Sequence, residues 1–175
     1  SYRDDGDEGF YLHLGRLDEE KGVPAVVEAF AGSAHDLVLA GGRGDVTDDV
    51  MARIRRTETV DFRGFVDEDE KRALLAACRA LVFNGRNEDF GIVPIEANAA
   101  GRAVLARAEG FPAVYVEAGR NGYLHDGTAE GIRGALERFE REGVSDPAAG
   151  VGQFGREAFR RNCRATIERW YDEFR

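Results

Sequence analysis

The sequence of 175 residues predicts an α/β protein with three layers, in which helices cover both faces of a parallel sheet of about six strands. Two observations predict this fold class. Short runs that are apolar throughout alternate along the chain with longer segments of helical periodicity. Strands that are apolar on both faces are typical of a parallel sheet that is buried on both sides.

The elements of the first third follow one another at short intervals. The apolar run 10–14 predicts a strand that ends at a glycine. Residues 23–30 predict a helix whose second residue is a proline, which the first turn tolerates. A second strand is expected at 36–40, closed by two glycines. A polar helix at 48–56 and a strand at 59–63, again followed by glycine, complete this part.

The middle of the chain continues the alternation. Residues 67–78 predict a helix, because apolar residues recur at spacings of three and four and the first turn is acidic. The run 80–83 predicts a strand. The next helix is expected to begin between Gly91 and Pro94, since proline lacks an amide donor and fits only a first turn. The run 103–106 predicts the fifth strand.

The last strand is expected at 122–125, and the last two helices at 129–142 and 156–174. Residues 1–9 are polar and acidic, so we expect an interdomain linker or tail there and a single domain at 10–175. The order of elements is that of a Rossmann-like domain. In such sheets, ligands bind outside the carboxyl ends of the strands.

The composition excludes several classes of partner and site. A net charge of −9 argues against a nucleic-acid partner. Cys78 and Cys163 match no metal or redox spacing, and we expect two buried or half-buried thiols in a reducing, cytoplasmic compartment. The three histidines show no metal-ligand spacing either. We expect one of them on a strand and two in loops or at the surface.

Residues 88–96, Glu-Asp-Phe-Gly-Ile-Val-Pro-Ile-Glu, form the most informative motif. They place Glu88 on the loop before a helix and Glu96 near the opening of that helix. Free backbone amides and the positive end of a helix attract anions. Carboxylates accept hydrogen bonds from hydroxyls, so such a site suits a phosphorylated ligand with many hydroxyls. The alternative is an exposed loop acid and a glutamate favoured by the helix dipole.

A second cluster follows the first predicted strand. Gly15 ends the strand, which places Arg16 at the ligand edge and Lys21 at the start of the first helix. Two converging cations can hold a diphosphate, the arginine as a planar fork and the lysine as a point charge. The alternative is that both cations pair with the nearby acids 18–20 on a solvated turn. Only two of the 24 basic residues are lysines, Lys21 and Lys71.

Other motifs carry weaker signals. Gly41 opens a glycine-rich segment after the second strand that allows close backbone approach to a nucleotide, although glycines there are commonly turn residues. No GxGxxG follows a strand, which argues against a dehydrogenase. Asp67-Glu68-Asp69 has the form of a metal-binding D-x-D motif, but it opens a predicted helix, and helix capping explains it better. We therefore predict no metal site.

Taken together, these motifs resemble the nucleotide-sugar-binding half of a retaining glycosyltransferase with the GT-B fold. The resemblance covers nearly the whole chain. It rests on the segments 14–17, 21–22, 37–42, 62–66, 88–97, 100–101 and 121–124. Members of this family are about twice as long, so the resemblance implies that an amino-terminal acceptor-binding domain is missing from this chain.

The resemblance also implies a role for each site residue. Arg16 and Lys21 would hold the donor diphosphate, Glu88 would accept hydrogen bonds from the donor sugar, and Glu96 would bind the ribose hydroxyls. The backbone at Gly15 and Gly41 would approach the donor. The backbone amides of Phe90, Gly91 and Ile92 would line the sugar–phosphate pocket. The segment Gly64, Phe65 and Val66 would lie against the base.

Some positions depart from the family pattern and leave the sugar open. Asn84-Gly85 stands where Pro-Ser is common in the family, and Ala113 stands where Glu is frequent. Arg102-Ala103 stands where a small residue and Pro usually follow the Ala-Gly pair at 100–101. The sequence of residues 88–96 favours mannose as the donor sugar.

From this resemblance we expect a donor-binding domain of an enzyme that moves a hexose from a UDP- or GDP-linked sugar to a hydroxyl acceptor, without a metal or other cofactor. The acceptor belongs to glycan, glycolipid or polysaccharide synthesis. The alternative is a non-catalytic nucleotide-sugar-binding or assembly module. The resemblance leaves open a membrane-associated acceptor and peripheral attachment of the parent enzyme to the inner face of the membrane. It also implies that part of the last helix crosses to the missing domain, whereas its amphipathic pattern alone suggests packing on its own domain.

Overall fold

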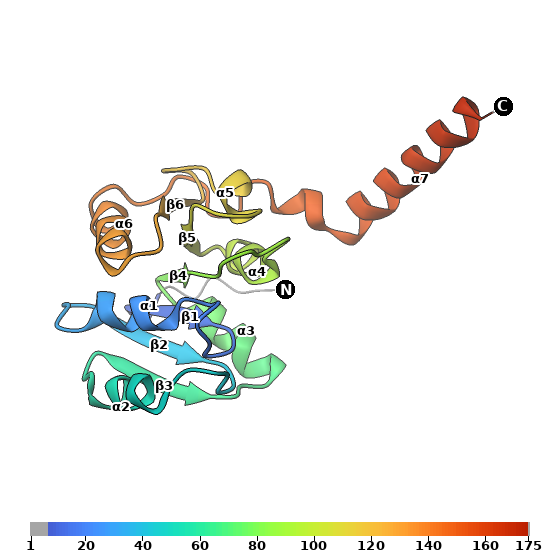
Figure 1. Ribbon diagram of the computed structural model, residues 1–175. Coiled ribbons are helices and arrows are strands. Elements are labelled where there is room, and N and C mark those ends of the chain that lie inside the picture. The colour runs from blue at the N-terminus through green and yellow to red at the C-terminus, as the bar shows by residue number, and fades with distance from the viewer. Residues whose placement is uncertain (1–6, 175) are drawn as a thin grey trace.

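The computed structural model describes residues 7–174 and contains one six-stranded sheet in which neighbouring strands pair in parallel. The strand order is β3-β2-β1-β4-β5-β6, so the chain reverses its direction of travel between β3 and β4 (Figure 1). The strands are β1 (Phe10–Leu14), β2 (Asp36–Ala40), β3 (Val60–Gly64), β4 (Ala80–Phe83), β5 (Ala103–Arg107) and β6 (Gly122–His125). The predicted fold class is confirmed.

Helices cover both faces of the sheet. Their bounds are α1 (Val23–Phe30), α2 (Asp48–Arg56), α3 (Glu68–Ala77), α4 (Ile92–Ala99), α5 (Pro112–Tyr115), α6 (Ala129–Glu142), the 3-10 helix η1 (Val151–Phe154) and α7 (Arg156–Glu173). Core residues of α1, α2 and α6 pack on one face, and those of α3, α4 and α5 on the other. The sequence does not predict α5 and η1, because four residues are too few to show a helical period.

Alternation along the central strands sends successive side chains to the two cores. Tyr11 and Leu39 belong to the core beneath α1 and α6, whereas Leu12 and Val38 belong to the core beneath α4. All four are buried. Burial of apolar surface on both sides of every central strand is the main stabilising contribution to this fold. The result is a rigid support for the loops at the carboxyl edge.

Local signals start the helices where the sequence predicts. Thr47 and Thr128 each accept a hydrogen bond from a backbone amide in the first turn of α2 and α6. Asp67 accepts bonds from the amides of Asp69 and Glu70, at 3.0 and 2.9 Å. The Asp-x-Asp motif is therefore a helix cap, as its position at the start of the predicted helix indicates.

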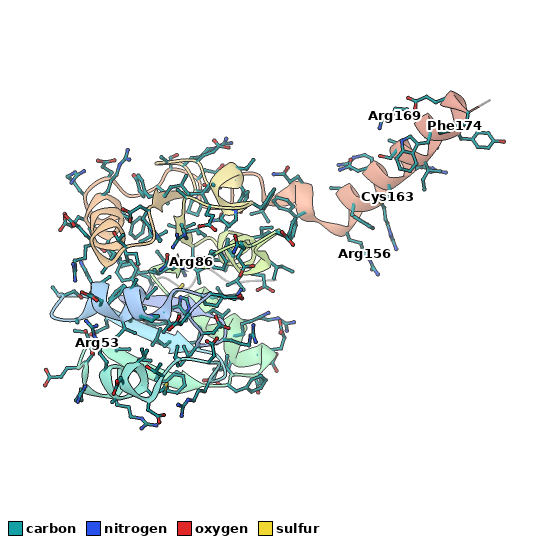
Figure 2. All side chains as sticks on the ribbon, viewed as in Figure 1. Arg53, Arg86, Arg156, Cys163, Arg169 and Phe174 are labelled. Carbon is teal, nitrogen blue, oxygen red and sulfur yellow. The ribbon has the colours of Figure 1, made fainter. Side chains whose placement is uncertain are left out.

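The last helix departs from the prediction that it packs on its own domain. In Figure 1, α7 leads away from the sheet, and its large apolar side chains are exposed, up to 67% for Phe159. Phe174, which follows the helix, is 90% exposed. Figure 2 shows Cys163 and Phe174 on this projecting segment. Cys163 is exposed, which corrects the expectation of a second buried or half-buried thiol. No helix within residues 7–174 is long and apolar enough to cross a bilayer.

The histidines also require a correction. His13 lies on β1 as expected for one of the three, but His125 is a second imidazole on a strand and is buried. Burial lowers the pKa of both imidazoles to about 4, so both are neutral at pH 7. Residues 7–9 lead into β1, where the amide of Glu8 donates to Ala77 at 2.8 Å. Residues 1–6 of the predicted linker or tail lie outside the described residues.

Candidate functional site

Three glycines bring the carboxyl ends of β1, β2 and β3 together. The amide of Gly15 donates to the carbonyl of Ala40 at 3.0 Å, and the amide of Gly41 donates to the carbonyl of Gly64 at 2.7 Å. Gly41 has a φ of 145°, and a Cβ built there would lie 1.9 Å from the carbonyl oxygen of Gly15. A side chain at this position is therefore excluded, and the edge presents bare backbone to any ligand.

Lys21 and Glu88 form an ion pair across this edge. Lys21 precedes α1 and Glu88 precedes α4, and each side chain is less than a third exposed. The alternative in which Lys21 pairs with acids of its own turn is wrong, because its ammonium contacts an acid 67 residues away. Glu88 is likewise a half-buried, paired carboxylate and not an exposed loop acid.

The turn after β1 connects Arg16 to this pair through Asp18. Asp18 is buried, accepts a hydrogen bond from the amide of Lys21 at 2.9 Å, and lies 3.3 Å from the guanidinium of Arg16. The side chain of Arg16 is 71% exposed. For Arg16 the local alternative therefore holds in this structure, but the exposed guanidinium can reach a ligand at the edge. The contacts form a continuous chain from Arg16 through Asp18 and Lys21 to Glu88.

Two residues that depart from the family pattern shape the loop that carries Glu88. A Cβ at Gly85 would lie 2.9 Å from Cγ of Glu88, so the glycine makes room for this carboxylate. Asn84 is buried, and its amide nitrogen donates to the carbonyls of Gly22 and Gly127 at 3.1 and 3.2 Å. Asn84 therefore joins the loop after β4 to the start of α1 and to the loop after β6.

Backbone contacts complete the support of this loop. Arg86, labelled in Figure 2, donates its amide to the carbonyl of Glu20 at 2.8 Å, and the amide of Phe111 donates to the carbonyl of Glu88 at 3.2 Å. The Phe90 ring stacks on Phe111, with centroids 5.2 Å apart, and meets Phe154 edge-on. The loop is thus held from both sides, which fixes the direction of its backbone.

The start of α4 offers amides without a side-chain cap. Gly91 lies at the N-cap with φ 62° and ψ 71°, a left-handed conformation that favours glycine, and no side chain caps the helix. The first turn carries no acidic residue. Uncapped first-turn amides, together with the helix dipole, form a favourable position for an anion. Ile92 is the first helical residue and is exposed, so the site is open to solvent.

Glu96 lies one turn further along α4 and pairs with a different lysine. Its Oε1 is 2.9 Å from the ammonium of Lys71, which comes from α3. Within the described part of the chain, no ion pair joins Glu96 to Arg16, Lys21 or Glu88, although all lie on loops or helices that begin at the same edge.

The comparison with known families decides the identity. A model of the glycosyl transferases group 1 family matches residues 1–157. The chain belongs to this family. The resemblance to this family of glycosyltransferases is therefore confirmed.

The curated relatives that match are longer than this chain. The alpha-1,3/1,6-mannosyltransferase ALG2 of Dictyostelium discoideum is 25% identical over 169 residues, which cover 83% of this chain and 40% of that protein. The D-inositol 3-phosphate glycosyltransferase of Streptomyces avermitilis is 38% identical over 111 residues, covering 63% of this chain and 23% of that protein. The chain thus spans well under half the length of these relatives.

Solved structures show the same fold. The crystal structure of Anabaena Alr3699/HepE in complex with UDP matches with a TM-score of 0.79 and 25% identity, over 93% of this chain and 49% of that chain. The C-terminal domain of a group 1 protein (LpcC) from Francisella tularensis matches with a TM-score of 0.67 and 21% identity, over 79% of this chain and 82% of that chain. These likenesses confirm the predicted C-terminal half of a GT-B fold.

The remaining predicted group 1 positions lie where their strands end. Phe65 follows β3 and is 84% exposed, while Val66 is half-buried against the core beneath α3 and α4. Sequence reasoning missed Lys71, Asn84 and Gly85 as parts of the site. The rarity of lysine is the signal that could have indicated Lys71. Within residues 7–174, no three acidic, histidine or cysteine side chains gather as a metal site would require.

Proposed function

We propose that this chain is the donor-binding domain of a retaining glycosyltransferase, which transfers a hexose from a nucleoside-diphosphate sugar to a hydroxyl acceptor. The observation that carries the proposal is the Lys21–Glu88 pair beside the uncapped start of α4. A cation and free helix amides suit a diphosphate, and a carboxylate beside them suits sugar hydroxyls.

The proposed chemistry relies on positioning and electrostatics. Arg16 and Lys21 stabilise the negative charge that grows on the departing diphosphate, and the amides at the start of α4 assist them. Glu88 neutralises Lys21 in the ion pair that the two side chains form. When the donor binds, its diphosphate replaces part of the contact between Glu88 and the Lys21 ammonium. The Glu88 carboxylate then accepts hydrogen bonds from the sugar hydroxyls. Both charges are therefore held ready at the edge before the donor arrives.

The favoured donor sugar is mannose, linked to UDP or GDP. The sequence of residues 88–96 supports mannose, and so do two relatives that are named mannosyltransferases. The structural neighbour HepE was solved with UDP and with UDP-glucose, which supports a nucleoside-diphosphate hexose as the class. A thermal-shift panel of UDP-, GDP- and ADP-linked hexoses decides the base and sugar, because a ligand that binds the folded state selectively raises Tm.

The proposed partner is an amino-terminal acceptor-binding domain, and the proposed location is the cytoplasm, with the parent enzyme free to meet an acceptor at a membrane surface. The test of catalysis uses the full-length enzyme. Arg16→Ala or Lys21→Ala should lower kcat/KM. The decrease should correspond to a loss of a few kcal/mol of transition-state stabilisation. Unchanged turnover in both variants contradicts the role assignment. Donor binding without transfer by the full-length wild-type protein supports the binding-module alternative instead.

A further inference from the structure

Each of the two lysines in this chain contacts one of the two glutamates of the 88–96 motif. Lys21 contacts Glu88, and Lys71 contacts Glu96 at 2.9 Å. The other 22 basic residues are arginines. Lysine is thus used at both glutamates. Apart from the additional contact of Lys71 with Glu68, the other ion pairs found within the described residues use arginine. The second pair lies between two helices, α3 and α4, and has no assigned role.

The contact geometry at Glu96 leaves one carboxylate oxygen without a partner. Oε1 accepts the hydrogen bond from Lys71, whereas Oε2 is buried and has no hydrogen-bond partner among the described residues. A buried acceptor that stays unpaired is costly, so such an oxygen points to a donor that a ligand supplies. Both side chains are largely buried, with 20% of Lys71 and 23% of Glu96 exposed.

Contacts with Glu68 and Glu96 stabilise the charged form of Lys71. Burial lowers the pKa of this ammonium, but hydrogen bonds to Glu68 and Glu96 outweigh that effect, and the pKa is raised. Lys71 lies 2.9 Å from Glu68 as well, so it is held from its own helix while it reaches across to α4. A permanently charged donor therefore fixes the position of the Glu96 carboxylate.

We propose that Lys71 is a positioning residue, which holds one oxygen of Glu96 so that the other accepts hydrogen bonds from the ribose of the donor. This inference rests on the proposed function and deepens it. It also explains why the residue is lysine. An ammonium is a point donor that engages a single oxygen, whereas a guanidinium is a fork that engages both.

Another ion pair of this chain shows how an arginine engages a glutamate. Arg79 contacts both oxygens of Glu140, with donor–acceptor distances of 2.6 and 2.7 Å. An arginine at position 71 would engage both oxygens of Glu96 in the same manner, so Oε2 would share its acceptor capacity between the guanidinium and a ligand. Lys71→Arg is therefore expected to preserve the charge and the link between the helices but to weaken Oε2 as an acceptor for a ligand.

A purely structural role for Lys71 makes the opposite prediction. If the pair only joins α3 to α4, Lys71→Arg should restore everything that Lys71→Met removes. Affinity for the ribose hydroxyls separates the two roles, because a structural link does not distinguish a ribonucleotide from its deoxy counterpart.

The experiment is isothermal titration calorimetry of the 175-residue chain with UDP, GDP and ADP and with their 2′-deoxy and 3′-deoxy counterparts. For the base that binds, the wild-type chain should prefer the ribonucleotide over at least one deoxy form by about tenfold or more, as expected for hydrogen bonds to a charged acceptor. Lys71→Met and Lys71→Arg should both reduce this preference to about twofold or less, while affinity for that deoxy form stays within about threefold of wild type.

Arg72→Met is the matched control. Arg72 is the adjacent basic residue of α3 and pairs with Glu68 and Asp69 but not with Glu96. It should keep the wild-type preference. Glu96→Gln should behave like Lys71→Met. If Lys71→Met does not fold, Lys71→Arg, which keeps the charge, carries the test, and folding is checked by circular dichroism.

The outcomes separate this inference from the proposed function. Wild-type preference retained in Lys71→Arg or Lys71→Met overturns the role of Lys71 while the donor site stands. Binding without any ribose preference in the wild-type chain overturns the role of Glu96 and, with it, that of Lys71. Binding of none of the nucleotides by the wild-type chain contradicts the proposed function itself and overturns both.

Discussion

The ammonium of Lys21 contacts the carboxylate of Glu88, which lies 67 residues away in the sequence. The contact joins the loop after β1 to the loop after β4, and these two strands are neighbours in the sheet. It therefore forms where the chain changes its direction of travel across the sheet, which is where ligands bind in open α/β sheets. The pair links the fold to the proposed donor site.

This pair should contribute measurably to the stability of the ligand-free chain. Lys21→Met and Glu88→Gln each leave a half-buried partner unpaired, so the two substitutions together should destabilise the chain by less than the sum of the single effects. We expect a coupling free energy of about 1 kcal/mol in a double-mutant cycle measured by urea unfolding.

The matched control for this cycle is an exposed ion pair. Arg43 and Asp48 pair at 2.5 Å with side chains that are 50% and 93% exposed. The corresponding cycle with Arg43→Met and Asp48→Asn should give a coupling close to zero, because water screens an exposed pair. Equal coupling in the two cycles would show that Lys21–Glu88 is an ordinary surface pair.

Gly85→Ser should disturb the site without removing any charged group. The added Cβ would lie within 2.9 to 3.2 Å of atoms of Glu88 and Phe83, so the side chain of Glu88 must shift, which disturbs its contact with Lys21. We expect weaker donor binding, by about tenfold, in calorimetric titrations. Gly134→Ala is the control, because α6 has open space there and alanine favours a helix. Donor affinity unchanged in Gly85→Ser would mean that the position of Glu88 does not matter for binding.

Stability should fall as the pH drops from about 6.5 towards 4. Burial lowers the pKa of His13 and His125 to about 4, whereas the unfolded chain takes up these protons near pH 6.5. Between those values the unfolded state binds more protons, so acidification favours unfolding by about 1.4 kcal/mol per pH unit for each histidine. Below about pH 4 this contribution levels off, because both states are then protonated.

Urea unfolding at pH 7 and pH 5 measures this effect. His13→Asn and His125→Asn should each remove about half of the histidine-dependent loss of stability, and the double variant nearly all of it. Each variant is compared with itself at the two pH values, so a lower absolute stability does not affect the conclusion. An unchanged pH dependence in the double variant would contradict the assignment of these two histidines.

The fold was largely predictable from the sequence because it depends on local patterns. Strand β1 and helix α6, for example, have the predicted bounds, since apolar runs and caps define them. Strand β3 lies one residue later than predicted, at Val60–Gly64. The burial of His125 was not predicted, because the residue is the last of its strand and borders a loop, and only the packed structure shows that β6 is covered there.

The site was predictable only in part, because its contacts are long-range. Residues 88–96 indicated both glutamates, and glycines after apolar runs indicated the edge. The partner of each glutamate depends on how the helices and loops pack. Lys71 reads in the sequence as one more charge on a polar helix, and only the packing of α3 against α4 brings it to Glu96. Likewise, the room that Gly85 provides for Glu88 depends on the folded loop.

The most direct measurement is calorimetric titration of the wild-type chain, Lys21→Met and Arg43→Met with UDP-, GDP- and ADP-linked hexoses. We expect that one nucleotide class binds the wild-type chain, that Lys21→Met weakens this binding at least tenfold, and that Arg43→Met leaves it within about twofold. Absence of binding to every nucleotide sugar, or wild-type affinity in Lys21→Met, would contradict a donor site built on Lys21 and Glu88.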